Sequence, residues 1–141
     1  MEDGKLPIAG AEDLIVPAHK FLANLDPEEY AAVVFTYDTH DPEVYKDSEE
    51  AKQFPPHCER FTPGWSLVVN PDVIPVEIPV YNIEKGVFNM WEEDNLIVLE
   101  SPMCGLDRDV FFNAVFEHVD AVDVFGVALN VCVEQAVIVL S

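Results

Sequence analysis

The sequence predicts a three-layer α/β/α fold in which a mainly parallel sheet lies between helices. Short apolar runs of strand length alternate along the chain with amphipathic runs of helical period, and this alternation favours parallel strands joined by helical crossovers. The 141 residues, half of them apolar, suffice for one domain (1–141) with a buried core. Polar residues of chemical interest follow two of the apolar runs, as they do at the carboxyl edge of such sheets.

The first part of the chain is expected to form a helix, a strand and a long loop. Residues 17–25 place four apolar side chains at helical spacing, and Pro17 suits the first turn. Residues 31–37 are a short run of β-branched and aromatic residues, which predicts a buried strand. Residues 38–62 are polar, contain prolines and have no period. A loop of that length in a compact domain is usually functional.

The second part alternates strands and helices. Residues 73–80 contain two prolines, which predicts a short or edge strand. Residues 95–100 can form an additional strand. Residues 108–117 carry apolar side chains at helical spacing, whereas residues 121–128 predict the second buried strand. Residues 131–140 are expected to begin a helix.

Composition limits the classes of partner and compartment. The net charge is −20, from 27 acidic and seven basic residues, so the chain repels phosphate backbones and nucleic acid is not expected as a partner. No apolar run reaches the ~18 residues of a membrane span. The first residues lack the pattern of a signal peptide, so a cytoplasmic location is expected. The acidic residues gather in polar stretches, as on solvated faces.

Two polar clusters have the residue types of a metal site. Asp38 and His40 lie two apart on an extended segment, where their side chains point the same way, and His57 follows at the other end of the loop. One carboxylate and two imidazoles, with positions left for water, suit a divalent ion. A lone D-x-H pattern more often caps a loop.

Cys132 is the candidate nucleophile among three cysteines that form neither a disulfide framework nor a CxxC knuckle. It follows the second apolar run, where a helix is expected to begin, and the helix dipole would lower the pKa of its thiol. The alternative is inert packing, which is the usual role of a buried cysteine. That role is assigned to Cys58 and Cys104.

Three fragments resemble the motifs of one known family. They are Asp38-Thr39-His40, then residues 54–58 (FPPHC) followed by residues 62–64 (TPG), and residues 126–133 (GVALNVCV). Together with Lys85 they resemble the nicotinamidase branch of the isochorismatase-like cysteine hydrolases, whose members carry D-x-H, P-P-H-C-x-x-x-T-P-G and G-V-A-x-x-V-C-V. The resemblance implies hydrolysis of nicotinamide to nicotinate and ammonia, a step of NAD salvage.

The resemblance also implies a role for each matching residue. Cys132 would attack the carboxamide carbon, and Lys85, from a K-x-x-F pattern, would stabilise the thiolate. The backbone N–H groups of Ala128 and Cys132 would form the oxyanion hole, after a cis peptide bond that precedes Ala128. Phe54 would stack against a pyridine ring, with packing against the core as its alternative. The alternative role of Lys85 is that of an ordinary solvated charge at the surface.

The implied cofactor is a divalent metal ion held by Asp38, His40 and His57, with zinc expected first and iron or manganese as alternatives. Some nicotinamidases place another histidine six residues after that of D-x-H, and Lys46 occupies this position here. Three protein ligands with water would still suit these ions.

The resemblance covers nearly the whole chain but only the middle of the family domain. The aspartate that family members use as proton carrier would lie upstream of Met1, so slow nicotinamide hydrolysis and self-association into a homo-oligomer are expected of this chain. Two alternatives stay open. One is a catalytically incompetent fragment or relative that binds small molecules or a partner, and the other is a metal-free hydrolase of another small amide.

Overall fold

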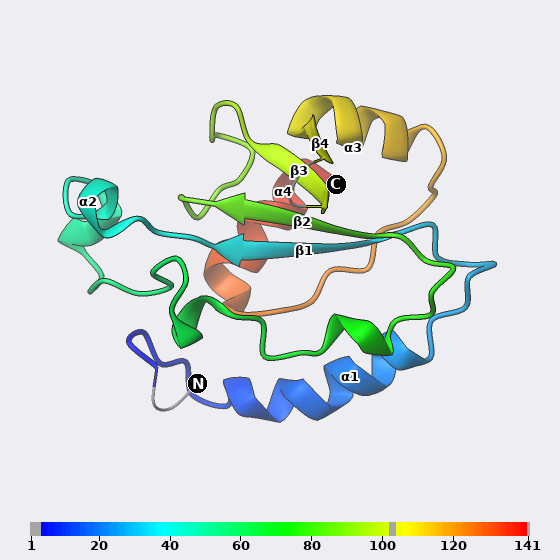
Figure 1. Cartoon of the computed structure of the whole chain (residues 1–141), viewed down its shortest axis with the longest axis horizontal. Coiled ribbons are helices and arrows are strands. Elements are labelled where there is room, and N and C mark those ends of the chain that lie inside the picture. Colours follow the sequence, from blue (N-terminus) through cyan, green and yellow to red (C-terminus); the bar gives the residue numbers. More distant parts are fainter. Residues whose placement is uncertain (1–3, 102–103, 141) are drawn as a thin grey trace.

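The computed structural model describes residues 4–101 and 104–140 and shows a mixed α/β fold around one four-stranded sheet (Figure 1). Its strands, in spatial order, are β1 (Val33–Asp38), β2 (Val80–Lys85), β3 (Ile97–Ser101) and β4 (Cys104–Asp107). β1 and β2 are parallel, whereas β2 pairs with β3 and β3 with β4 in antiparallel fashion.

The prediction of a mixed α/β fold is therefore confirmed, and the prediction of a mainly parallel sheet is wrong for the described residues. The physical reason lies in the connections. A parallel pair needs a long crossover, and the segment between β1 and β2, which contains a short helix and three 3₁₀ turns, supplies it. From β2 onward the chain returns without an intervening helix, so β3 and β4 run antiparallel to their neighbours.

Four α-helices accompany the sheet in the described part of the chain. They are α1 (Ile15–Ala23), α2 (Pro42–Tyr45), α3 (Arg108–Phe116) and α4 (Glu134–Leu140). Short 3₁₀ turns span Ala11–Leu14, Glu50–Lys52, Pro63–Trp65 and Pro71–Val73, and a π-helical turn spans Leu129–Val133. The helices predicted over 17–25 and 108–117 are confirmed by α1 and α3. The described helices include none with the length and apolar character needed to cross a bilayer.

Apolar clusters pack on opposite faces of β1 because neighbouring side chains of a strand point to opposite sides. Val33 and Phe35 pack against a cluster under α1, whereas Val34 packs against a cluster that includes Phe111 of α3. The buried members of the α1 cluster are Leu22, Leu25, Ile74 and Ile78. Those of the α3 cluster are Ile83, Met90, Leu96, Val98 and Phe111. The sheet thus has an apolar core on each side.

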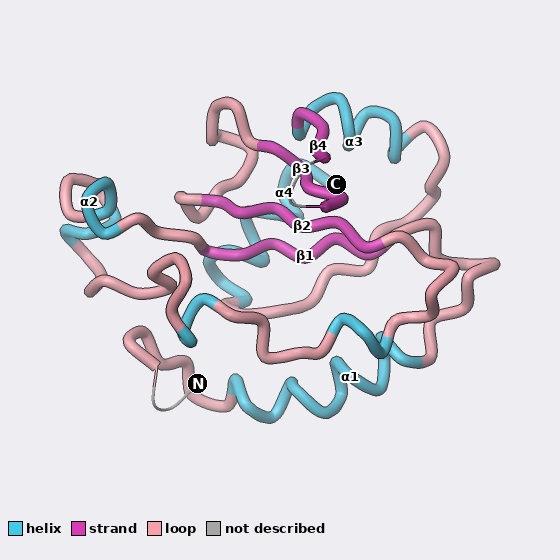
Figure 2. Tube along the Cα trace, viewed as in Figure 1, coloured by secondary structure: helices cyan, strands magenta, loops and turns pink. Residues whose placement is uncertain are grey.

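Two strand predictions fail and a third shifts in burial. Residues 73–79 form a 3₁₀ turn and loop, and the strand begins only at Val80, after the second proline; β2 is also central rather than an edge strand. Residues 121–127 are loop, with exposed side chains, although a buried strand was expected (Figure 2). β1 is only partly buried. Within the described residues only one of its two edges pairs with another strand, and the other edge stays open.

The remaining predictions largely agree with the structure. The strand expected over 95–100 is confirmed by β3. The helix expected over 131–140 begins as the π-helical turn and continues as α4. The loop over 38–62 contains α2 and the turn Glu50–Lys52, so it is more structured than its sequence predicts. Asp41 caps α2 by accepting a hydrogen bond from the Glu43 N–H.

Candidate thiol and metal site

The parallel pairing of β1 and β2 brings Asp38 and Lys85 together. The two residues are register partners at the carboxyl ends of their strands, and in Figure 1 both arrowheads point toward the loop that carries α2. The Lys85 ammonium is buried and donates a short hydrogen bond to Oδ1 of Asp38. It also donates to the carbonyl oxygen of Val87 at 3.2 Å. The ammonium is therefore fixed at the edge of the sheet.

Cys132 completes this group from the π-helical turn. Its Sγ lies 3.7 Å from Nζ of Lys85 and 4.0 Å from Oδ2 of Asp38. A thiol, an ammonium and a carboxylate thus meet in one place, as the positions of Asp38 and Cys132 after separate apolar runs led us to expect. The apolar run before Cys132 is a loop, however, and not the predicted strand.

The electrostatics of the thiol differ from the prediction. Burial raises the pKa of Cys132 and the charge of Asp38 raises it further, while Lys85 opposes both effects. The expected lowering of this pKa by a helix start is therefore wrong in direction. Burial alone would lower the pKa of Lys85, but the charges of Asp38 and Cys132 outweigh it and raise that pKa. Lys85 consequently stays an ammonium ion.

Two buried histidines face a carboxylate beside this group. The rings of His40 and His57 lie 4.8 Å apart, and the ring of Tyr45 packs against both. Oε1 of Glu50 lies 3.2 Å from Nε2 of His57 and 3.6 Å from Nε2 of His40. None of these three buried atoms makes a hydrogen bond of good geometry. Buried polar atoms without hydrogen bonds are costly, and a cation placed between these three would satisfy them.

The hydrogen bond of the His57 ring fixes which nitrogen is free. Nδ1 lies 2.8 Å from the carbonyl oxygen of Pro55, and because a carbonyl only accepts, Nδ1 carries the proton. In the neutral ring Nε2 then offers its lone pair, as in histidines that bind metals. Burial lowers the pKa of His40, which favours the same neutral form. Contact with Glu50 raises the pKa of His57, so a proton competes with a metal ion there.

The donor atoms fit a divalent ion, but they are divided differently from the prediction. Donors around a tetrahedral zinc lie about 3.3–3.8 Å apart by bond lengths of about 2.0–2.3 Å. The two contacts of Glu50, at 3.2 and 3.6 Å, are close to this spacing. His40, Glu50 and His57 form one group with all donor atoms within 4.8 Å, and Asp38, His57 and Cys58 form another. The predicted trio of Asp38, His40 and His57 is thus divided between two groups in the described residues.

Glu50 is the residue that sequence reasoning missed. It lies in the acidic stretch over 41–50, one of the polar stretches whose composition is typical of a solvated face. Its side chain is only 9% exposed, whereas that of Glu49 is 87% exposed and pairs with Lys52. Nothing in the local pattern distinguishes these two neighbours. The position between the two histidine motifs is common to both, so the sequence offers no signal that singles out Glu50.

Backbone contacts hold the two histidine segments together. The His40 N–H donates to the carbonyl oxygen of Cys58, and the Arg60 N–H donates back to that of His40, both at 3.0 Å. The result is an isolated parallel bridge between His40 and Glu59. Nε1 of Trp65 donates to the hydroxyl of Thr39 at 2.8 Å. The D-x-H segment is therefore held by hydrogen bonds at both Thr39 and His40.

The remaining predicted residues lie at the margin. The ring of Phe54 packs edge-on against that of Phe88, with centroids 5.5 Å apart. The peptide bond between Val127 and Ala128 is cis, as expected. The carbonyl of Ala128 accepts hydrogen bonds from the N–H groups of Val131 and Val133 at 3.2 Å. Substrate stacking by Phe54 and the oxyanion hole at Ala128 and Cys132 stay predictions.

Comparison with known proteins finds no family model, no curated protein and no solved structure that matches this chain. The resemblance to the cysteine hydrolases therefore depends on the motifs themselves. The geometry above is independent of it.

Proposed function

We propose that this chain forms one domain of three-layer α/β/α type and acts as a cysteine amidohydrolase of the nicotinamidase type. The single observation that carries the proposal is the meeting of Cys132, Lys85 and Asp38. A thiol, an ammonium and a carboxylate are the nucleophile, the electrostatic stabiliser and the proton carrier that acyl transfer through cysteine requires. Their segments are far apart in the sequence, since Asp38 and Cys132 are separated by 94 positions.

The reaction would proceed in two balanced steps. Sγ of Cys132 attacks the carboxamide carbon, the C–N bond breaks, and ammonia leaves with the thiol proton. Water then cleaves the thioester and gives the acid and the free thiol. Among the described carboxylates, that of Asp38 lies 4.0 Å from Sγ, close enough to accept the proton and to return it to the leaving amine. Lys85 would stabilise both the thiolate and the oxyanion, with the N–H groups of Ala128 and Cys132 as further donors.

His40, Glu50 and His57 would hold a divalent ion, and a carboxylate oxygen of Asp38 lies within 4.8 Å of a ring nitrogen of His57. Zinc suits these nitrogen and oxygen donors, and iron or manganese would also be accepted. When bound, such an ion would supply positive charge that holds and polarises an aromatic nitrogen or a water molecule. The apolar faces of Phe54 and Phe88 would hold a flat heteroaromatic ring, which is why nicotinamide is the proposed substrate.

Ammonia release from nicotinamide tests the proposal. Wild type should release ammonia above background, even if slowly, and Cys132→Ala and Lys85→Ala should abolish the release. Cys104→Ala is the matched control, since Cys104 is exposed and lies outside the site. Release that survives in Cys132→Ala would contradict the assigned nucleophile. Wild type without any release that depends on Cys132 would contradict the hydrolase.

A second candidate function is supported by its own observation. The three buried donor atoms of His40, Glu50 and His57 lack hydrogen bonds of good geometry, and a bound ion would satisfy them whether or not the thiol reacts. A metal-dependent binding module without catalysis would satisfy them equally well. Zinc bound to a wild-type protein that releases no ammonia would favour this function. The same observation disfavours a metal-free amidohydrolase.

A further inference from the structure

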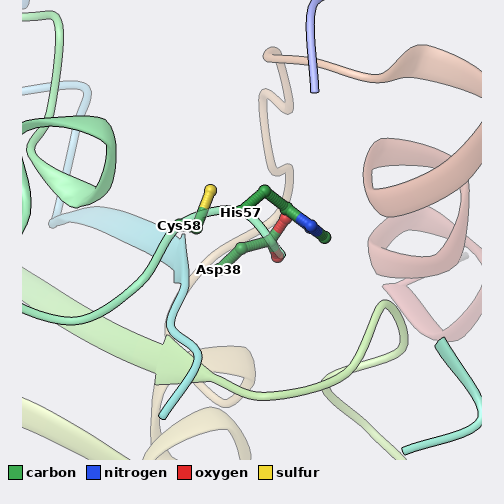
Figure 3. Close-up of side chains that lie close together, drawn as sticks. All are labelled: Asp38, His57 and Cys58. Atoms are coloured by element: carbon green, nitrogen blue, oxygen red, sulfur yellow. The ribbon is translucent and has the colours of Figure 1, made fainter. Parts of the chain in front are cut away.

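Cys58, which sequence reasoning assigned to packing, belongs to a second set of metal donors. Its Sγ, a carboxylate oxygen of Asp38 and a ring nitrogen of His57 lie within 4.8 Å of one another (Figure 3). His57 is therefore common to this set and to the set that contains His40 and Glu50. No hydrogen bond of the Cys58 thiol is found within the described residues, so its sulfur is not committed to another partner.

The shared histidine makes the two sets compete. Nδ1 of His57 is engaged by the carbonyl oxygen of Pro55, which leaves Nε2 as the nitrogen that can bind an ion. Nε2 is buried, and Oε1 of Glu50 lies 3.2 Å from it without forming a hydrogen bond of good geometry. One lone pair binds one ion at a time. An ion held through Cys58 and an ion held through His40 and Glu50 cannot both use His57.

The two sets also differ in chemistry. His40, Glu50 and His57 offer nitrogen and oxygen, which many divalent ions accept, whereas Cys58 adds a soft sulfur that selects thiophilic ions. We propose that the loop offers one divalent ion two mutually exclusive positions that share His57, and that thiophilic ions such as Cd²⁺ occupy the second one through Sγ of Cys58. This second position is the new site.

Occupation of the second position would disable the thiol group. Asp38 is the short hydrogen-bond partner of Lys85 and also lies 4.0 Å from Sγ of Cys132. A carboxylate that binds an ion turns away from these two groups, so a thiophilic ion would act as an inhibitor. The donor atoms of Asp38, His57 and Cys58 would have to move only a little to bind an ion. Donors of a tetrahedral site lie about 3.3–3.8 Å apart, and these three atoms lie within 4.8 Å of one another.

The local backbone supports the second position. Cys58 has a positive φ of 45°, unusual for a residue other than glycine. Its carbonyl accepts the hydrogen bond of His40, and two residues later the Arg60 N–H returns a bond to the His40 carbonyl. The segment that carries the thiol is thus fastened to the end of β1, which carries Asp38.

Titration with Cd²⁺ alone tests the inference, because thiolate bound to Cd²⁺ gives a charge-transfer band in the near ultraviolet. A Cys104→Ser background removes the exposed thiol. In this background we expect the band to saturate at one ion per chain and zinc to be displaced from zinc-loaded protein in equal amount. The added change Cys58→Ser should abolish the band and leave zinc loading intact, whereas Cys132→Ser should keep the band.

The outcomes that would overturn the inference are equally distinct. A band that persists in Cys58→Ser, or that disappears in Cys132→Ser, would assign the sulfur ligand to another residue. Cd²⁺ bound without loss of zinc would show two independent positions rather than exclusive ones. If Cys58→Ser failed to fold, alkylation mapped by mass spectrometry in wild type would decide: Cd²⁺ should protect Cys58 and leave Cys132 reactive, and the reverse would contradict the proposal.

The inference shares His57 with the proposed function but does not require hydrolysis. Its readouts are absorbance, bound metal and thiol protection, none of which depends on turnover. A chain that releases no ammonia but shows the band would retain this second position, and a hydrolase without the band would lose only this inference.

Discussion

Lys85 is a buried cation whose position depends on one neighbour. Its ammonium is almost inaccessible, whereas the Asp38 side chain is 24% exposed. A buried charge that loses its partner keeps its desolvation cost, and a partly exposed carboxylate regains water instead. The two partners are therefore unequal in what their removal costs.

We predict that Asp38→Asn destabilises the protein more than Lys85→Met does. The first change leaves the buried ammonium without its charged partner and should lower the free energy of unfolding by about 3–5 kcal/mol. The second change replaces the ammonium side chain by an apolar one of similar length. The free energy of unfolding in urea measures both. A larger loss for Lys85→Met would mean that the ammonium is better hydrated than its burial indicates.

The reactivity of Cys132 should follow the charges around it. Because its pKa is raised, the reactive thiolate is scarce at neutral pH and increases as pH rises past the ordinary thiol pKa of about 8.5. Asp38→Asn removes a charge that raises this pKa, so alkylation at neutral pH should become faster. Lys85→Met removes the opposing charge and should make it slower. Mass spectrometry at a series of pH values, with exposed Cys104 as the internal reference, gives the rates; equal profiles in all three proteins would contradict the prediction.

The loop between β1 and the turn Pro63–Trp65 carries most of the candidate metal donors. α2 and the turn Glu50–Lys52 fold this loop back so that Glu50 meets both histidines. The hydroxyl of Tyr45 also donates to the carbonyl oxygens of Phe54 and Pro55, at 3.1 and 3.3 Å. These contacts hold the donor side chains with little freedom, which favours a preorganised site.

Glu50→Gln should therefore weaken zinc binding by roughly tenfold or more, because the amide lacks the charge that the ion requires. Glu49→Gln is the matched control, one residue away but exposed and paired with Lys52. Competition with a chromogenic chelator measures both affinities. Equal affinities in the two variants would remove Glu50 from the site.

The elements that could be predicted from the sequence are those with a strong local period. α1 and α3 show apolar residues at helical spacing, and β1 and β3 are β-branched runs between polar segments. Residues 121–127 have an equally apolar composition but form a loop, because a strand also needs a neighbour to pair with. The direction of β3 is set by the short segment that connects it to β2. That segment has no apolar period from which its path could be predicted.

The residues of the candidate site also fall into those that the sequence could predict and those that it could not. Asp38, His40, His57, Lys85 and Cys132 could be selected because each belongs to a short motif with a chemical reason for its residue types. Glu50 and the donor set of Cys58 could not. Their roles follow from how the loop folds, which depends on contacts between residues distant in the sequence.

The molecule as a whole combines strong acidity with exposed apolar surface. The net charge is −20. A cavity of about 400 Å³ lies between α1 and the loop after α3, and its lining is mainly apolar and does not include Cys132. Within the described residues no strand pairs with the outer edge of β1. Such edges and apolar surfaces favour association, which the charge opposes.

Association should consequently increase with ionic strength. The Debye length falls from roughly 30 Å at 0.01 M salt to roughly 3 Å at 1 M, so repulsion between acidic copies weakens while the apolar surface is unchanged. Sedimentation velocity at several salt concentrations measures the mass. A mass that stays constant, or that falls as salt rises, would show that charge does not limit association.

The indole of Trp65 adds an optical property to the candidate metal centre. Its N–H is bonded to the hydroxyl of Thr39, the residue between Asp38 and His40. Any shift of these donors changes the polarity around an intrinsic fluorophore. The other tryptophan, Trp91, is bonded to α4 through the carbonyl of Ala136, and replacing it with phenylalanine would leave a single emitter. The chain thus carries its own reporter, whose emission can follow the arrival and exchange of ions in real time without an added dye.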